Sequence, residues 1–199
     1  MPKLWNETIE AHRHGVRSRT PDLNASLATA TLEPCPASTG GLAVRLGLGT
    51  VRGIGSELAS EIAAGRPYAS LEDLVRRVPS LQLQQLEALA TAGVFTECFG
   101  MERREALWAV GAVSQSRPGR LTGVVTGTHA PRLPGMTTVE EAAADLWATG
   151  VSPDGHPTTF VRAELDRLGV TTSAGLWHAE PGSRVLIGGV VTHRQRPMT

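Results

Sequence analysis

The sequence has almost no lysine and no excess of charge of either sign. Lys3 is the only lysine among 19 basic residues, and 19 acidic residues balance them to a net charge of zero. A buried catalytic lysine and the Gly-Lys-Ser/Thr of a phosphate-binding loop are therefore excluded. Because the overall charge is neutral, attraction to nucleic acid has to come from a local group of donors.

Cysteines and long apolar runs are also scarce. Cys35 and Cys98 are the two cysteines, and their separation matches neither a disulfide framework nor a metal-binding Cys-x-x-Cys. The apolar runs stop well short of the ~20 residues that span a bilayer, and residues 1–7 lack the apolar stretch of a signal peptide. We therefore expect a soluble, cytoplasmic protein with no membrane partner.

The patterns that carry metal or phosphoryl-transfer chemistry are missing. Two-metal catalysis requires clustered carboxylates, and the aspartates never occur as Asp-x-Asp. Glu140 and Glu141 fall in the first turn of an expected helix, where the helix dipole stabilises negative charge. The six histidines form no His-Glu-x-x-His motif and have no cysteine pair nearby. We expect no catalytic residue, no metal and no cofactor in this chain.

The spacing of apolar residues predicts a mainly α-helical fold that is divided by many breaks. The 22 glycines and 13 prolines interrupt the pattern repeatedly, so we expect several small packing units. The segment 43–48 predicts a short strand leading into a turn, and the β-branched run 185–191 predicts a terminal strand. Helical spacing, with capping residues and prolines at the ends, predicts helices over 3–14, 56–66, 70–78, 83–93, 102–113, 138–149 and 160–168.

These elements divide the chain into five segments. A single strand cannot form a sheet, so we expect the chain to stop inside a domain and residues 184–199 to be loosely docked. The segments are a short helix and extended linker (1–42), a helical domain (43–113), a Pro/Gly-rich linker (114–136), a small helical segment (137–181) and the terminal strand (182–199).

The aromatic residues are expected in the core. Each tryptophan falls on the apolar face of a predicted helix, which favours packing over stacking on bases. His156 lies in a Pro-rich turn, where a local hydrogen bond is its expected role. The tryptophans are Trp5, Trp108, Trp147 and Trp177.

The segment Gly53-Ile54-Gly55 carries the most specific signal. Glycine allows a tight reversal of the backbone and close approach by a ligand, while Ile54 fits between two helices. A helix that begins at Ser56 has unpaired N–H groups suited to a phosphate oxygen. Such contacts position a duplex without reading its sequence. With side-chain donors from Thr50 and Arg52, the predicted DNA-binding residues are Thr50, Arg52, Gly53, Ile54, Gly55 and Ser56.

A structural interpretation of this turn stays open. Gly-x-Gly turns also join helices that bind no nucleic acid. A second, related turn at 89–95 is better explained as an ordinary helix end and is assigned no site residues. The charge around the first turn is sparse, which predicts weak binding with a shallow salt dependence. It consists of Arg45, Arg52 and Arg66 against Glu57 and Glu61.

The string Gly-Ile-Gly-x-x-x-Ala-x-x-Ile at 53–62 resembles the helix-hairpin-helix motif. More widely, the chain is similar to the C family of bacterial DNA polymerases, which contains the replicative polymerase III alpha subunit and its error-prone relative. Residues 103–108 and 191–197 look more like the error-prone, damage-inducible branch. The resemblance covers nearly the whole chain and rests on residues 14–16, 21–24, 44–55, 68–74, 86–95, 148–157 and 185–197.

The resemblance implies a helical domain whose hairpin holds duplex DNA, followed by an oligonucleotide-binding (OB) barrel of which this chain contains only the first strand, 182–199. It places the catalytic carboxylates of the nucleotidyltransferase upstream of this chain, so the fragment itself is expected to be inactive. The expected function is a non-catalytic hold on duplex DNA backbone during error-prone synthesis, damage tolerance and DNA repair. The alternative is a protein-interaction module in which the helices of 43–113 dock another polymerase subunit.

Overall fold

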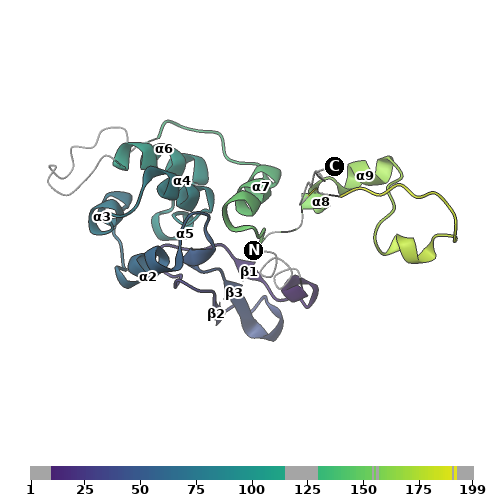
Figure 1. The fold of residues 1–199 in the computed structure, drawn as a ribbon, viewed down its shortest axis with the longest axis horizontal. Coiled ribbons are helices and arrows are strands. Elements are labelled where there is room, and N and C mark those ends of the chain that lie inside the picture. The colour runs from purple at the N-terminus through teal and green to yellow at the C-terminus, as the bar shows by residue number, and fades with distance from the viewer. Residues whose placement is uncertain (1–9, 115–129, 154, 156, 190, 192–199) are drawn as a thin grey trace, which may run out of the picture. The chain divides into compact units, whose positions relative to one another are not determined.

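The computed structural model describes residues 10–114, 130–153, 155, 157–189 and 191, drawn as a ribbon in Figure 1. The chain forms two compact units, Met1–Asp154 and Gly155–Thr199. The boundary between the two units follows residue 154. Within the described ranges, no helix combines the length and apolar character needed to cross a bilayer.

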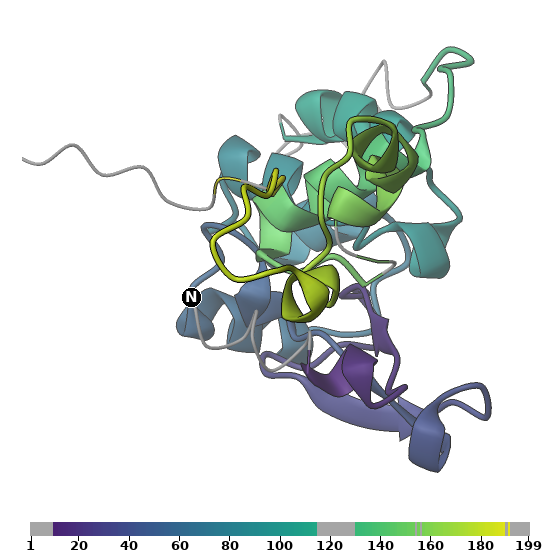
Figure 2. The same ribbon diagram turned by 90° about the vertical axis from the view of Figure 1, so that its right-hand side faces the viewer.

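A three-stranded mixed sheet opens the first unit and corrects the expectation of an extended linker before residue 43. The strands β1 (Ser18–Arg19), β2 (Thr31–Pro34) and β3 (Leu42–Arg45) are ordered β1-β3-β2. The central strand β3 pairs parallel with β1 and antiparallel with β2. Strands of two to four residues are too short to show a period-two pattern, so the sequence signalled only β3. Figures 1 and 2 both place this sheet on one side of the helices.

The segment between β1 and β2 is tied to the helices. Leu23 is fully buried in the helical core, and its N–H donates to the carbonyl oxygen of Val94 at 3.0 Å. The Asn24 side chain donates to the Tyr68 carbonyl at 3.0 Å and accepts from the Tyr68 N–H at 2.9 Å. Its proline and small polar residues predicted a linker. The buried Leu23 and the paired side-chain amide of Asn24 instead hold the segment against the helices.

The helices of the first unit follow the expected order. They are α2 (Ser56–Ala64), α3 (Leu71–Arg77), α4 (Leu83–Thr91), α5 (Thr96–Phe99), α6 (Arg103–Val113) and α7 (Thr138–Thr149). Ser70 caps α3 by accepting from the Asp73 N–H, as its spacing predicted. Thr137 and Glu140 form the capping box of α7, and Gly150 ends that helix. The short helix α5 was not predicted.

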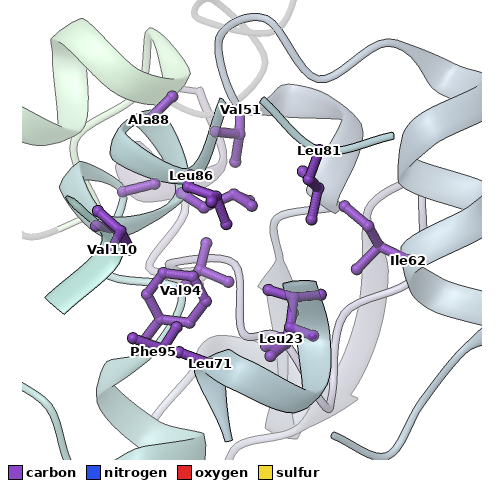
Figure 3. Close-up of a cluster of buried hydrophobic side chains, with 14 of the residues drawn as sticks. Leu23, Val51, Ile62, Leu71, Leu81, Leu86, Ala88, Val94, Phe95 and Val110 are labelled. Carbon is purple, nitrogen blue, oxygen red and sulfur yellow. The ribbon is translucent and has the colours of Figure 1, made fainter. Parts of the chain in front are cut away.

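The core of the first unit lies between these helices and the turns that join them. Figure 3 shows Leu23, Ile62, Leu86 and Phe95 among the apolar side chains that meet there. The helices α4 and α6 share the largest helix–helix contact, and α7 packs against α4. The core therefore combines the helical domain with residues from the sheet region and from α7.

The tryptophans do not fill this core, contrary to expectation. Trp108 on α6 and Trp147 on α7 are 51% and 50% exposed, and Trp177 is 89% exposed. Small residues such as Ala109 and Ala148 supply the buried positions of α6 and α7, so the bulky rings lie at the flanks of the packed faces. Trp5 and His156 lie outside the described residues.

The second unit contains short elements. The helix expected over 160–168 is divided into α8 (Pro157–Phe160) and α9 (Arg162–Arg167), and a 3-10 turn, η3, covers Gly175–His178. The expected strand over 185–191 is limited, in its described part, to one parallel bridge between Leu186 and Val170. A strand requires a partner that pairs with it over several residues, and the described residues of this unit pair at one position only.

The expected 114–136 linker is only partly visible. Residues 115–129 lie outside the described residues, and residues 130–136 have no regular secondary structure. Residues 10–13 are helical, as the first predicted helix requires, and residues 1–9 lie outside the described ranges.

Candidate nucleic-acid interface

The Gly-Ile-Gly turn is formed as a hairpin between two helical segments. A 3-10 turn, η2 (Leu48–Thr50), leads into Val51, and α2 begins at Ser56. Gly53 has a φ of 76°, a left-handed conformation that L side chains rarely adopt. Ile54 is 4% exposed, and its N–H donates to the Val51 carbonyl at 3.0 Å. One glycine thus reverses the chain and the isoleucine anchors the turn in the core.

The outer side of the turn is open backbone. Arg52, Gly53, Gly55 and Ser56 are all exposed. Gly55 is the N-cap of α2 and has no side chain to satisfy the first amides of the helix. Among the described residues, none accepts a hydrogen bond from the N–H of Gly53, Gly55 or Ser56. A Cβ on Gly55 would meet no atom within 4 Å, so an anion can approach these amides closely.

Two of the predicted site residues face the interior of the turn. The Thr50 hydroxyl donates to the Gly47 carbonyl at 2.7 Å, which commits its proton to the 3-10 turn. Ile54 is buried and contributes packing rather than a contact surface. The structure therefore brings Arg52, Gly53, Gly55 and Ser56 together on the surface and assigns Thr50 and Ile54 to the scaffold beneath them.

The three arginines near the turn differ in whether their side chains are available to a ligand. Arg45 is 3% exposed and pairs with Glu33 and Glu97, each at 2.9 Å. Arg66 donates to the carbonyl oxygens of Ala63 and Ser26 at 2.8 and 2.9 Å. Both side chains are used to hold the fold, so Arg52 is the cation that stays available.

Arg52 is held by α7, which the sequence did not connect with the turn. Its backbone N–H donates to the Ala148 carbonyl at 2.7 Å, and its guanidinium carbon lies 5.0 Å from the centre of the Trp147 ring. On the other side of the turn, the Gln85 amide of α4 donates to the Gly53 carbonyl at 3.1 Å. Helices α4 and α7 therefore hold the two residues that precede Ile54.

Helix α7 is itself anchored by two arginines of α6. Arg103 pairs with the buried Asp145 at 2.7 Å, and Arg104 pairs with Glu140 at 2.7 Å. The hydrogen bond from the Thr137 N–H lowers the pKa of the Glu140 carboxyl, and Arg104 adds to the shift. Glu140 is thus a capping residue, in line with the structural role expected for the Glu140–Glu141 pair.

The second glycine turn is covered. Gly93 has a φ of 74°, and a Cβ there would lie 3.0 Å from Nε of Arg103. Val94 and Phe95 are buried, and the Val94 carbonyl accepts from the Leu23 N–H. The interpretation of this turn as a structural helix end agrees with that burial.

The missed contacts, Trp147 and Gln85, carried little signal in the sequence. Trp147 is far from Arg52 along the chain, and a tryptophan in a helical stripe usually predicts core packing. Gln85 is a capping residue of α4 by its spacing from Gln82, but that spacing says nothing about Gly53. In the part of the chain that the structure describes, no group of three His, Cys, Asp or Glu residues is placed to hold a metal ion.

Comparison with known proteins agrees with this geometry. A family model described as "Helix-hairpin-helix motif" matches residues 15–106, so the sheet and the helices through the start of α6 fall within one match. The first unit is thus a helix-hairpin-helix region with a mostly helical fold and a small mixed sheet.

The relatives of the chain are error-prone DNA polymerases. It is 56% identical over 194 residues to the error-prone DNA polymerase of Mycolicibacterium paratuberculosis, 55% over 194 residues to that of Mycobacterium tuberculosis, and 52% over 201 residues to that of Nocardia farcinica. Each alignment covers 96% of this chain and 17% of the relative. By sequence the chain corresponds to a fragment of an error-prone DNA polymerase.

Proposed function

We propose that this chain is the part of an error-prone DNA polymerase that holds the sugar-phosphate backbone of duplex DNA, without sequence preference, during synthesis across damage and repair. The observation that carries the proposal is the open outer side of the Gly53–Ser56 turn. Amides of Gly53, Gly55 and Ser56 without a protein partner follow Arg52 in the chain, and the Arg52 guanidinium makes no hydrogen bond with any other described residue. Oriented amides at a helix start and an arginine together suit one phosphate group.

The contact surface is small, so binding is weak. Glu57 and Glu61 on α2 are exposed and oppose the approach of a polyanion. Arg45 and Arg66 are committed to the fold. We therefore assign the attraction mainly to backbone amides and to Arg52, which gives non-specific positioning rather than sequence recognition.

The proposal is tested by placing bulk on the outer side of the turn. Gly55→Val adds a side chain where the free protein has open space, at a φ of −72° that valine adopts. We expect about tenfold weaker binding to random-sequence duplexes in fluorescence anisotropy, because a hydrogen bond to a charged group contributes roughly 1.5 kcal/mol. Gly111→Val is the matched control, since Gly111 is also exposed with open space around it, on α6. Equal affinity of both variants and the wild type would contradict the proposal.

A second test removes charge. Arg52→Ala should weaken duplex binding, whereas Arg167→Ala, which changes the net charge equally in the other unit, should leave it unchanged. Circular dichroism of each variant checks that the fold is retained. If both arginine variants lose affinity to the same extent, the attraction comes from net charge and not from the turn.

The alternative function is the docking of another polymerase subunit by the helices of 43–113. The half-exposed Trp108 on α6 favours it, because exposed aromatic rings are common anchors at protein interfaces. Binding of a purified polymerase subunit that Trp108→Ala abolishes, with no measurable affinity for DNA, would favour this alternative.

We further propose that the chain alone does not incorporate nucleotides, and that residues 182–199 form the first strand of an OB barrel when the other strands are present. The described residues of this segment, from 182 to 189 with 191, leave Ile187 and Val191 exposed. Extension of a primed template by the purified 199-residue chain would contradict the first statement. A longer chain in which residues 185–191 show no slowing of amide exchange would contradict the second.

A further inference from the structure

Among the described residues of the first unit, two arginines lie over aromatic rings, and they differ in what their N–H groups contact. Arg77 lies 4.7 Å from the centre of the Tyr68 ring and donates to the carbonyl oxygens of Gly65 and Pro67. Arg52 lies 5.0 Å from the centre of the Trp147 ring. Its guanidinium makes no hydrogen bond or ion pair with any other described residue. The Arg77 guanidinium is therefore bonded within the fold, whereas the side-chain N–H groups of Arg52 have no partner in the part of the chain that the structure describes.

Stacking on a ring keeps those donors accessible. An indole ring offers the five N–H groups of a guanidinium no oxygen or nitrogen acceptor, so they stay able to donate to a phosphate. The ring also restricts the otherwise flexible arginine side chain. Less conformational entropy is then lost when the side chain binds a ligand. Trp147 is half exposed, so the stacked pair lies at the surface, where a phosphate can reach it.

The position of the ring is fixed by contacts other than that of the Arg52 side chain. The buried ion pair between Arg103 and Asp145 attaches α7 to α6 at 2.7 Å. The 2.7 Å hydrogen bond from the Arg52 N–H to the Ala148 carbonyl then sets the turn against the end of α7. Trp147 immediately precedes Ala148, so the ring is held next to the backbone that enters the hairpin.

We infer that Trp147 is a positioning residue of the DNA-binding turn: it orders the Arg52 guanidinium at the surface of the turn that carries the exposed Gly53 and Gly55, so that arginine and amides bind the phosphodiester backbone together. The inference rests on the proposed function and adds α7 to the interface. Trp147 acts here through Arg52 and not through a base contact of its own.

A double-mutant cycle on the full chain tests this role. Trp147→Leu should weaken binding to a random-sequence duplex about two- to fivefold, the range expected for an exposed cation–π contact. Trp147→Phe should retain part of that affinity, because phenylalanine keeps a weaker π face. The double variant with Arg52→Ala should bind no more weakly than Arg52→Ala alone. Trp108→Leu, which removes an equally exposed tryptophan from α6, should bind like the wild type.

A second measurement needs no DNA. In the wild type the Arg52 side-chain protons should show an upfield ring-current shift in NMR spectra, which Trp147→Leu removes and Trp108→Leu preserves. Wild-type affinity of Trp147→Leu, or additive losses in the double variant, would overturn the positioning role while leaving the proposed function in place. Equal affinity of the wild type, Arg52→Ala and Gly55→Val would overturn both.

Discussion

The two glycine turns of the first unit have the same local geometry and different surroundings. Gly53 and Gly93 have φ values of 76° and 74°. The apolar residue after each glycine is buried and donates its N–H to a nearby carbonyl, at 3.0 Å for Ile54 and 3.1 Å for Val94. The backbone reversal is therefore a local property of glycine followed by a buried apolar residue, and it recurs in the second unit at Gly169, whose φ is 73° and whose neighbour Val170 donates to the Leu165 carbonyl at 2.9 Å.

What covers each turn decides its role. The Val94 carbonyl accepts from Leu23, and Arg103 packs against Gly93. Burial also raises the pKa of the neighbouring Cys98 thiol to about 12. The first turn has no such cover on its outer side, where Gly55 faces open space. A hairpin is therefore a candidate ligand site only when tertiary packing leaves its outward amides free.

The residue two positions after each glycine provides the largest test of this difference. Phe95→Ala should cost roughly 3–5 kcal/mol in the free energy of unfolding, because a fully buried aromatic ring is removed from the core. Gly55→Ala should cost less than about 1 kcal/mol, since the new Cβ meets no atom within 4 Å. Urea unfolding followed by circular dichroism measures both. Similar losses would mean that the first turn is as closely packed as the second.

Alanine at the two left-handed glycines gives the next largest difference. Gly53→Ala should cost about 1–2 kcal/mol, the strain of a left-handed L residue, because its Cβ comes no nearer than 4.0 Å to Gln85. Gly93→Ala should cost about 1.5–3 kcal/mol more, since its Cβ displaces Arg103 from the ion pair with Asp145. Thermal and urea unfolding of both variants measures the difference. Equal costs would show that Arg103 relaxes freely.

The sequence predicted most of the helices because residues close in sequence determine where each helix begins and ends. Ser70 accepts from the Asp73 N–H and Gly150 adopts the left-handed conformation, as capping and termination rules require. The hairpin was also predictable, since Gly53 and Ile54 act through their own backbone and side chain. These features depend on neighbours within a few residues.

The remaining features depend on contacts between distant residues. Thr31–Pro34 pairs with β3 without a readable period, and Leu23 enters the core from a segment rich in proline and small polar residues. At the site, Arg45 and Arg52 look alike in the sequence, but Glu33 and Glu97 neutralise the first and Trp147 stacks on the second. Counting the arginines near the motif in the sequence therefore overestimates the positive charge that is exposed to a ligand.

That distinction predicts the salt dependence of DNA binding. Counting Arg45, Arg52 and Arg66 gives a log–log slope of about −2 to −3, whereas Arg52 alone gives about −1. The affinity for a random duplex should then fall only about fourfold between 50 and 200 mM salt. Arg52→Ala should bring the slope near zero. Measurement by anisotropy at several salt concentrations decides, and a slope steeper than about −2 would mean that other cations contact the phosphates.

The smallest expected effect lies at the start of α7, the helix that contacts the first turn. The Glu140 carboxylate accepts from the Thr137 N–H at 2.8 Å and pairs with Arg104, and these contacts lower its pKa below the ordinary value of 4.5. A carboxyl whose folded-state pKa is lowered stabilises the fold fully above its unfolded value. That contribution is lost as the pH falls through the folded value. The Thr137 amide proton shift should therefore titrate with a midpoint below 4.5.

Two variants separate the causes of this shift. Arg104→Gln should move the midpoint upward but leave it below the ordinary value, because the Thr137 N–H is the larger cause. Glu140→Gln keeps an acceptor oxygen but cannot titrate, so the pH dependence of the Thr137 amide should disappear. The second turn lies outside this capping box, and the amide of Val94 should show no transition at the same pH. A common transition of the Thr137 and Val94 amides would mean that acid unfolds the whole first unit. The two turns would then unfold together, with the same free energy of unfolding.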